Sequence, residues 1–282
     1  MDSARTNSLV IFTHIYRCAG SSLVANFLPY YSPEQRLGLN PSKVSTAWQR
    51  PNNRFRWNRE TVRRYVATNA SGKTRLISGH LAHIGLHWSV PTNVTPYYII
   101  FLRDPYERIV SLYRYHLGKE KGPWHEELTD NAWSPEEWLR NSSMPWCRNG
   151  QLRQLIWHEY PEVLQNDVSL THEHLLAGKR MLEQYDYIGL VEHFEDDAHY
   201  LFGKFNLWKS APKWIVNASY AKTALPKQAL TLLAESNQLD LSLYEFANER
   251  RQHFVRNNRL RYWHFRRKAR ILRAFSEYCP KA

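Results

Sequence analysis

The 282-residue sequence has little cysteine and no long hydrophobic run. Cys18, Cys147 and Cys279 lie far apart and form no C-x-x-C pair, which argues against a zinc ribbon and a disulfide-stapled scaffold. The longest apolar runs, such as 97–102, have the length of a strand, so no transmembrane helix is predicted. The first residues contain no apolar segment of the length that a signal peptide needs. These absences favour a reducing compartment, and we expect a cytoplasmic protein.

Four Asn-x-Ser/Thr sequons point the other way. They begin at Asn69, Asn93, Asn141 and Asn217, and such sites are glycosylated only in a secretory lumen. The Golgi lumen is therefore the alternative location, if the chain is a piece of a longer lumenal protein.

Several motifs of nucleotide and metal sites are also absent. There is no GxxxxGK[ST], which argues against a P-loop nucleotide kinase, and no D-x-D, which argues against a metal-dependent glycosyltransferase. His80, His83 and His87 have helix-like spacing, but no HExxH is present and no acidic residue lies close to them. We therefore expect no metal site.

The sequence is rich in basic and aromatic residues. It carries 38 Lys and Arg against 26 Asp and Glu, a formal net charge of +12, and 14% of its residues are aromatic. This balance points to an anionic partner such as a nucleotide, an acidic sugar, an acidic membrane or nucleic acid. Ten Lys or Arg and no Asp or Glu lie between Arg250 and Arg273. That segment is either a solvated helix face or a docking surface for an acidic polymer or membrane.

Short β-rich runs alternate with helical patterns along the chain. Strands are expected at 8–13, 75–78, 97–102 and 187–191. Helices are expected at 23–28, 61–68 and 105–117, after Ser134, and at 149–159, 171–184, 194–205, 226–236 and 240–273. Residues 29–60 look like an irregular insertion, and 119–130 like a polar loop. The alternation predicts an α/β fold, with a central, mainly parallel sheet flanked by helices and a helix-rich C-terminal half.

We expect a single domain over residues 1–282. Its nucleotide-binding and catalytic core would be 8–117, followed by a helical remainder at 118–249 and a basic segment at 250–282.

The segment after the first strand is a candidate anion-binding loop. It reads HIYRCAGSS from His14 and leads into a helix, whose first backbone N–H groups and positive dipole end suit a phosphate. Gly20 lets the backbone approach a ligand closely, Ser21 and Ser22 add hydroxyl donors, and Arg17 adds a permanent positive charge. The alternative is an ordinary strand-to-helix turn made of small residues.

A second candidate follows the 97–102 strand. Arg103 lies at its carboxyl end, where open α/β sheets bind ligands, and Ser111 follows about two helical turns later. Arg103 could contact a phosphate through two donors, with Ser111 adding a hydroxyl. The alternative is a structural ion pair of Arg103 or Arg108 with Asp104 or Glu107.

The third candidate is His80, which follows Gly79 at the end of the 75–78 strand. A histidine at a strand end of the same sheet could reach a substrate hydroxyl and act as a general base. A surface or core histidine is the alternative.

In this order, HIYRCAGSSL, SGH and YYIIFLRDPYERIVSLY resemble the motifs of sulfotransferases that use PAPS (3′-phosphoadenosine 5′-phosphosulfate). The likeness is to the carbohydrate branch that includes the heparan sulfate 2-O-sulfotransferases and many bacterial members, and it is clearest over 8–117. It implies a P-loop-like three-layer fold. The resemblance assigns the 5′-phosphosulfate to Arg17, Cys18, Ala19, Gly20, Ser21 and Ser22, the 3′-phosphate to Arg103 and Ser111, and the role of base to His80. Arg17 stands where the family has Lys, and Tyr16 where it has Pro.

The resemblance implies transfer of the PAPS sulfonate to a hydroxyl of an acceptor, most readily a carbohydrate, with PAP as the product and no metal. Arg17 would stabilise the charge that develops on the leaving group. No nucleic acid partner is expected. A polyanion- or membrane-binding module and a P-loop nucleotide kinase are the alternatives. Six tryptophans in or beside predicted loops could stack on sugar rings or pack in the core: Trp48, Trp57, Trp88, Trp124, Trp133 and Trp146.

Overall fold

The first strand shows how the sequence sets up a layered fold. In β1 (Ser8–Thr13), Leu9 and Ile11 point into one hydrophobic core, while Val10 and Phe12 point into a second core on the other face. Successive side chains of a strand alternate between its faces, so a strand covered on both sides reads as an unbroken apolar run. β1 is therefore the middle of a sheet sandwiched between two helical layers.

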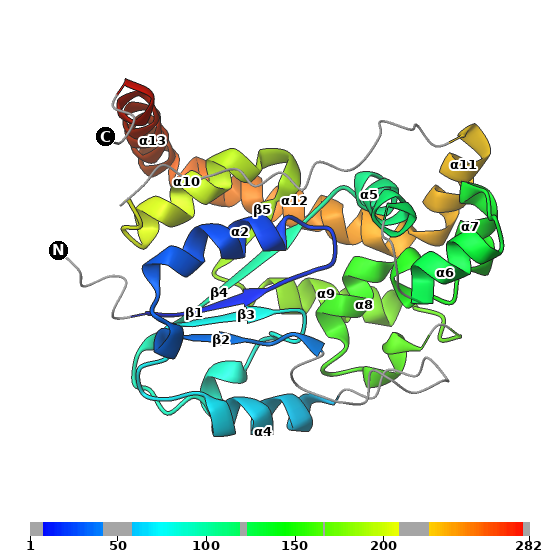
Figure 1. The fold of residues 1–282 in the computed structure, drawn as a ribbon, viewed down its shortest axis with the longest axis horizontal. Coiled ribbons are helices and arrows are strands. Elements are labelled where there is room, and N and C mark those ends of the chain that lie inside the picture. Colours follow the sequence, from blue (N-terminus) through cyan, green and yellow to red (C-terminus); the bar gives the residue numbers. More distant parts are fainter. Residues whose placement is uncertain (1–7, 42–57, 119–122, 166, 209–225, 279–282) are drawn as a thin grey trace.

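A computed structural model describes residues 8–41, 58–118, 123–165, 167–208 and 226–278 (Figure 1). Five strands form one sheet in the order β2-β3-β1-β4-β5, and every pairing in it is parallel. The other strands are β2 (Arg36–Gly38), β3 (Leu76–Gly79), β4 (Thr95–Leu102) and β5 (Tyr187–Leu190). The predicted α/β class with a mainly parallel sheet is confirmed.

Helices cover both faces of the sheet (Figure 1). The core on the Val10 face includes residues of α2 (Gly20–Phe27), α10 (Phe194–Lys204) and α13 (Arg259–Tyr278). The core on the Leu9 face includes residues of α4 (Arg59–Asn69), α5 (Pro105–Leu117), α8 (Gly150–Ile156), α9 (His172–Leu182) and α12 (Gln238–Asn257). Against α5 pack α6 (Pro123–Asp130) and α11 (Lys227–Ser236), and α7 (Pro135–Asn141) packs against α11. Single 3₁₀ turns are η1 (Leu28–Tyr30), η2 (Pro33–Gln35), η4 (Leu86–Ser89), η5 (Pro145–Cys147), η6 (Pro161–Leu164) and η7 (Val191–His193).

Two predictions of irregular structure are wrong. The supposed insertion at 29–60 contains β2, one of the two edge strands of the sheet. Three half-buried residues that pair on one side only leave no apolar run to detect. The supposed loop at 119–130 contains α6, in which Trp124 packs against the core and Leu128 is 2% exposed. Only one apolar i,i+4 pair, Trp124 and Leu128, marks this helix in the sequence.

The predicted helix over 240–273 is two helices. Asn258 separates α12 from α13, and its side-chain amide donates to Phe254 O at 2.9 Å. An asparagine that satisfies a helix-end carbonyl in this way competes with continuation of the helix. The predicted start at Ser134 is confirmed, because Ser134 and Glu137 form a reciprocal capping box on α7.

The basic C-terminal helices are tied to the sheet through a buried ion pair. Arg251 Nε and Nη2 of α12 donate to Asp197 Oδ1 and Oδ2 of α10 at 2.6–3.0 Å, and Asp197 Oδ2 also accepts the N–H of Leu190 in β5 at 3.0 Å. Arg266 pairs with Asp196 at 2.9 Å. Two of the basic residues between 250 and 273 are thus neutralised within the chain.

Across the described ranges, no helix combines the length and the apolar character that crossing a bilayer requires. Trp48, Trp57, Asn217 and Cys279, which were singled out above, lie outside the described residues.

Candidate functional site

The three loops predicted to carry the chemistry follow β1, β3 and β4, which are neighbours in the sheet. Because the strands are parallel, their carboxyl ends meet at one edge. Arg17 Nε donates to Ser111 Oγ at 3.0 Å, and Arg103 Nη1 lies 3.5 Å from Arg17 O. The first and second predicted loops are therefore in direct contact, and Arg17, Arg103 and Ser111 come together.

The start of α2 is open to a ligand. Arg17 and Ala19 adopt left-handed backbone conformations, with φ of 65° and 56°. No side chain caps the helix, and its first turn contains no acidic residue. Ser21 is exposed there, whereas Ser22 is buried. The loop thus presents a helix N-terminus whose positive end has no capping side chain, as expected of an anion site.

Gly20 is required by its contact with His14. A Cβ atom at position 20 would lie 1.8 Å from His14 Cδ2, so only glycine fits above this ring. His14 was not predicted as a site residue, although it opens the HIYRCAGSS segment. Sequence alone carries no signal that its ring lies beneath the glycine.

Cys18 has a supporting role. Its thiol is 1% exposed and lies 3.4 Å from Gln151 Oε1, and its backbone N–H donates to Ile15 O. Burial raises the pKa of this thiol to about 12. Both donors of Cys18 are used inside the protein, so it holds the loop in place rather than presenting a donor to a ligand.

Arg103 combines a structural contact with an unused donor. Its Nη2 lies 3.5 Å from the exposed Glu107 Oε2, while its Nε has no hydrogen-bond partner among the described residues. Asp104 caps α5 by accepting the N–H of Glu107 at 3.0 Å. Arg108 is fully buried and donates to Trp146 O at 2.8 Å. The predicted structural ion pair is therefore found between Arg103 and Glu107, whereas Arg108 pairs with Asp240 at 3.7 Å. The Nε of Arg103 is the donor of this side chain that still has no partner among the described residues.

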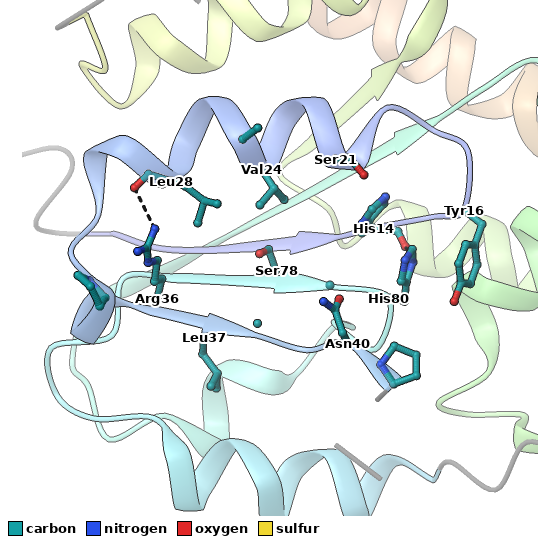
Figure 2. A pocket seen from close by; sticks show the side chains of 15 residues that line it. His14, Tyr16, Ser21, Val24, Leu28, Arg36, Leu37, Asn40, Ser78 and His80 are labelled. Carbon is teal, nitrogen blue, oxygen red and sulfur yellow. Dashed lines mark hydrogen bonds between the residues drawn. The ribbon is translucent and has the colours of Figure 1, made fainter. Parts of the chain in front are cut away.

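His80 is clamped between two rings. The ring centroids of His14 and Tyr16 lie 4.2 Å and 3.8 Å from that of His80, both in stacked geometry (Figure 2). His80 Nδ1 lies 2.7 Å from His14 O. A carbonyl oxygen only accepts, so Nδ1 carries the proton and Nε2 is the basic nitrogen of the neutral ring. Burial lowers the pKa of His80 to about 4, which keeps the ring neutral at pH 7.

His80 lines one pocket of about 960 Å³ together with three residues of the anion loop: His14, Tyr16 and Ser21. Arg17, Arg103 and Ser111 are not among its lining residues. Figure 2 shows His14, Tyr16, Ser21 and His80 at one end of this pocket. At the other end, Arg36 of β2 donates to Leu28 O at 3.4 Å. A substrate hydroxyl in this pocket could meet both Ser21 of the anion loop and the imidazole of His80.

Two glutamines on α8 hold the loops, and sequence reasoning missed both. Gln151 Oε1 accepts the N–H of Arg103 at 2.9 Å, and its Nε2 donates to Arg103 O at 2.8 Å. Gln154 Oε1 accepts the N–H of Tyr16 at 2.9 Å. Polar residues three apart on a helix usually face solvent, so no sequence pattern placed these two in the core. Asp240 of α12 in turn accepts the N–H of Gln151 at 3.0 Å.

The predicted histidines at 80, 83 and 87 do not converge. His83 Nδ1 lies 2.9 Å from Leu81 O, and His87 Nδ1 lies 2.7 Å from the hydroxyl of Tyr98. Within the described ranges, no group of three metal-ligating side chains is found.

The tryptophans divide between core and surface. Trp146 is 2% exposed, and Trp124 and Trp133 pack against the core, whereas Trp88 is 79% exposed. Of the described candidates for sugar stacking, Trp88 alone presents most of its ring to solvent.

Comparison with known proteins gives a family. A family model described as "Sulfotransferase family" matches residues 5–247. The heparan-sulfate 6-O-sulfotransferase 2 of Gallus gallus is 23% identical over 288 residues, covering 86% of this chain and 66% of its own length. The 6-O-sulfotransferase 1 of the same species is 26% identical over 271 residues, covering 85% and 65%. The 6-O-sulfotransferase 1-B of Danio rerio is 23% identical over 316 residues, covering 96% and 72%. The chain spans about two thirds of the length of these relatives.

The comparisons confirm the carbohydrate branch, although the matching relatives are named for 6-O transfer and the motifs were likened to the 2-O enzymes. They also correct the expected location. The relatives act in the Golgi, so the cytoplasmic expectation is wrong. A low cysteine count does not indicate the compartment of a domain of this size, because such a domain has a core that is stable without disulfides.

Proposed function

The chain belongs to the sulfotransferase family, and from this membership we propose that it transfers the sulfonate of PAPS to a hydroxyl of a carbohydrate acceptor. The observation that carries the proposal is the neutral His80, oriented by His14 O, in the same pocket as the anion loop. The relatives are named for heparan sulfate and its 6-hydroxyl, which makes a primary hydroxyl of an acidic glycan the first acceptor to test.

The residues present suit a donor with two anionic ends. The uncapped start of α2, with Arg17, Gly20 and Ser21, would hold the 5′-phosphosulfate. Arg103, whose Nε has no partner among the described residues, and Ser111 would hold the 3′-phosphate. PAPS supplies a sulfonate activated by a phosphate leaving group. The hydrogen bond between Arg17 and Ser111 fixes the spacing of the two ends.

The reaction needs a proton acceptor beside the acceptor hydroxyl. As the hydroxyl oxygen forms its bond to sulfur and the bond from sulfur to the phosphate oxygen breaks, Nε2 of His80 takes the hydroxyl proton. The Nδ1–H bond to His14 O stabilises the imidazolium that results.

Arg17 acts through its charge alone. A guanidinium does not give up its proton at neutral pH, so Arg17 stabilises the negative charge on the leaving oxygen but does not protonate it. Arg17→Ala should therefore lower turnover more than it weakens PAP binding. An unchanged turnover would remove Arg17 from this role.

Ligand-dependent melting tests the donor, and transfer of radiolabelled sulfonate from PAPS to heparan-type glycans tests the reaction. PAP should raise the melting temperature more than ATP or GTP at equal concentration. Equal stabilisation by ATP, or no transfer to any glycan, would contradict the proposal.

The role of His80 has its own test. His80→Asn should bind PAP normally and lose about 10²- to 10⁴-fold in turnover, the range for a general base. His172→Asn, at an exposed position on α9, is the matched control and should keep full activity.

A further inference from the structure

Two arginines on α4 have no acidic partner among the residues that the structure describes. Arg59 and Arg63 lie one helical turn apart, and neither takes part in an ion pair within the part of the chain that the structure describes. Their Nε atoms are buried without a hydrogen-bond partner there. By contrast, Arg64 on the same helix is exposed and lies 4.0 Å from Glu60.

Both guanidinium groups come together at Gly85, next to an exposed aromatic ring. A Cβ atom at Gly85 would lie 3.3 Å from Arg59 Nη2, 3.5 Å from Arg63 Nη2 and 4.0 Å from Trp88 Cδ1. Gly85 has a φ of 87°, which favours glycine, so the two guanidinium groups lie against a residue without a side chain. Trp88 is 79% exposed, and its ring lies against that of His87, with the centroids 4.3 Å apart.

The histidines next to Arg59 and Arg63 add no negative charge. His83 is 1% exposed, and its Nε2 has no hydrogen-bond partner among the described residues. Its ring stacks on that of His158 with the centroids 4.5 Å apart. Burial, and then the nearby Arg59 and Arg63, lower the pKa of His83 to about 4. The two positive charges therefore face neutral histidines, and no carboxylate offsets them in the described part of the chain.

The two guanidinium groups beside the ring of Trp88 suit a ligand that is both anionic and a sugar. Paired guanidinium groups bind a carboxylate or sulfate through several donors, and an exposed indole offers a flat apolar face to a sugar ring. Gly85 is five residues along the chain from His80, so their Cα atoms are at most about 19 Å apart. One oligosaccharide could therefore reach both places.

We propose that Arg59, Arg63 and Trp88 form a binding subsite for an anionic sugar of the acceptor, separate from the sugar that is sulfated. The carboxylate or sulfate would bind the two guanidinium groups, and the ring would stack on Trp88. This inference rests on the proposed function, because it adds a specificity element to the same acceptor.

The test compares variants of the full chain for binding of a fluorescent heparin octasaccharide at saturating PAP and fixed salt. Arg59→Gln with Arg63→Gln should weaken octasaccharide binding about tenfold or more, since each lost charge-assisted hydrogen bond matters. Arg64→Gln, which removes one exposed charge from the same helix, should change it by less than about twofold. Trp88→Ala should weaken it about threefold to tenfold.

The outcomes separate this subsite from the proposed function. PAP affinity should be unchanged in all four proteins, and a protein that fails to bind PAP at all contradicts the proposed function instead. The subsite is overturned if the unaltered protein does not bind the octasaccharide, if Trp88→Ala has no effect, or if the double variant loses no more affinity than Arg64→Gln. If a fully desulfated octasaccharide binds equally well, the two guanidinium groups bind the carboxylate of the sugar and not a sulfate.

Discussion

The two glutamines of α8 allow the donor loops and the base to be perturbed separately. Gln151 and Gln154 are 0% and 3% exposed, and methionine has a similar shape without the amide. Gln151→Met removes the acceptor of the Arg103 N–H and the donor to Arg103 O. Gln154→Met removes the acceptor of the Tyr16 N–H. The first change loosens the Arg103 loop, and the second loosens the ring that stacks on His80.

The magnitudes follow from the number of groups left without a partner. A buried polar group that loses its hydrogen bond costs about 1–3 kcal/mol. Gln151→Met orphans two backbone groups of Arg103, so the free energy of unfolding should fall by about 2–6 kcal/mol. Gln154→Met orphans the Tyr16 N–H and should cost about 1–3 kcal/mol. Urea denaturation of both variants checks these values.

Function should divide between the two variants. Gln151→Met should weaken PAP binding about tenfold, a loss of about 1.4 kcal/mol, because Arg103 is no longer held at the strand end. Gln154→Met should bind PAP almost normally and lose turnover, because Tyr16 no longer fixes the imidazole. Calorimetric titration with PAP and a transfer assay measure both effects. Equal PAP affinities for the two variants would refute the separate roles.

Three further predictions concern stability and packing. The pKa of His80 is about 4 in the folded protein and about 6.5 when unfolded, so the unfolded chain binds the extra proton as the pH falls. His80 alone should therefore lower the free energy of unfolding by about 1.4 kcal/mol per pH unit between pH 6.5 and 4. The buried His14, His83 and His158, whose pKa values burial also lowers, add to this loss, and the urea midpoint of His80→Asn should depend less on pH. Gly20→Ala places a Cβ 1.8 Å from His14 Cδ2 and should cost about 1–3 kcal/mol and most of the turnover, in melting and transfer assays. Arg251→Met leaves Asp197 buried without its partner, and urea denaturation should show a loss of about 3–5 kcal/mol.

The sequence predicted the sheet well where strands are buried on both faces. β1 and β4 are nearly continuous apolar runs, and α5 begins at Pro105 as expected. It failed for β2, which has three half-buried residues, because an edge strand needs no apolar run. The spacing of apolar residues indicates which faces of an element are buried, so a short strand that is only half-buried is hard to detect.

The candidate site was predictable in part. Residues that follow strand ends, such as Arg17, His80 and Arg103, could be found because a parallel sheet gathers them at one edge. The supports, Gln151 and Gln154, could not be found in this way. They act through buried hydrogen bonds to loops more than 40 residues away in the sequence, and no local pattern encodes such a contact.

The contacts that hold the Arg103 loop can form only after the C-terminal part of the chain has been synthesised. The N–H of Gln151, which holds Arg103, is itself bound by Asp240, and Asp240 lies 3.7 Å from Arg108. A chain growing on the ribosome displays residues 8–117 long before Asp240 is made. We therefore expect a nascent chain ending after β5 to contain all five strands but to hold the loops after β1 and β4 loosely. Capture of the donor would then be a late event, possible only when α12 has left the ribosome.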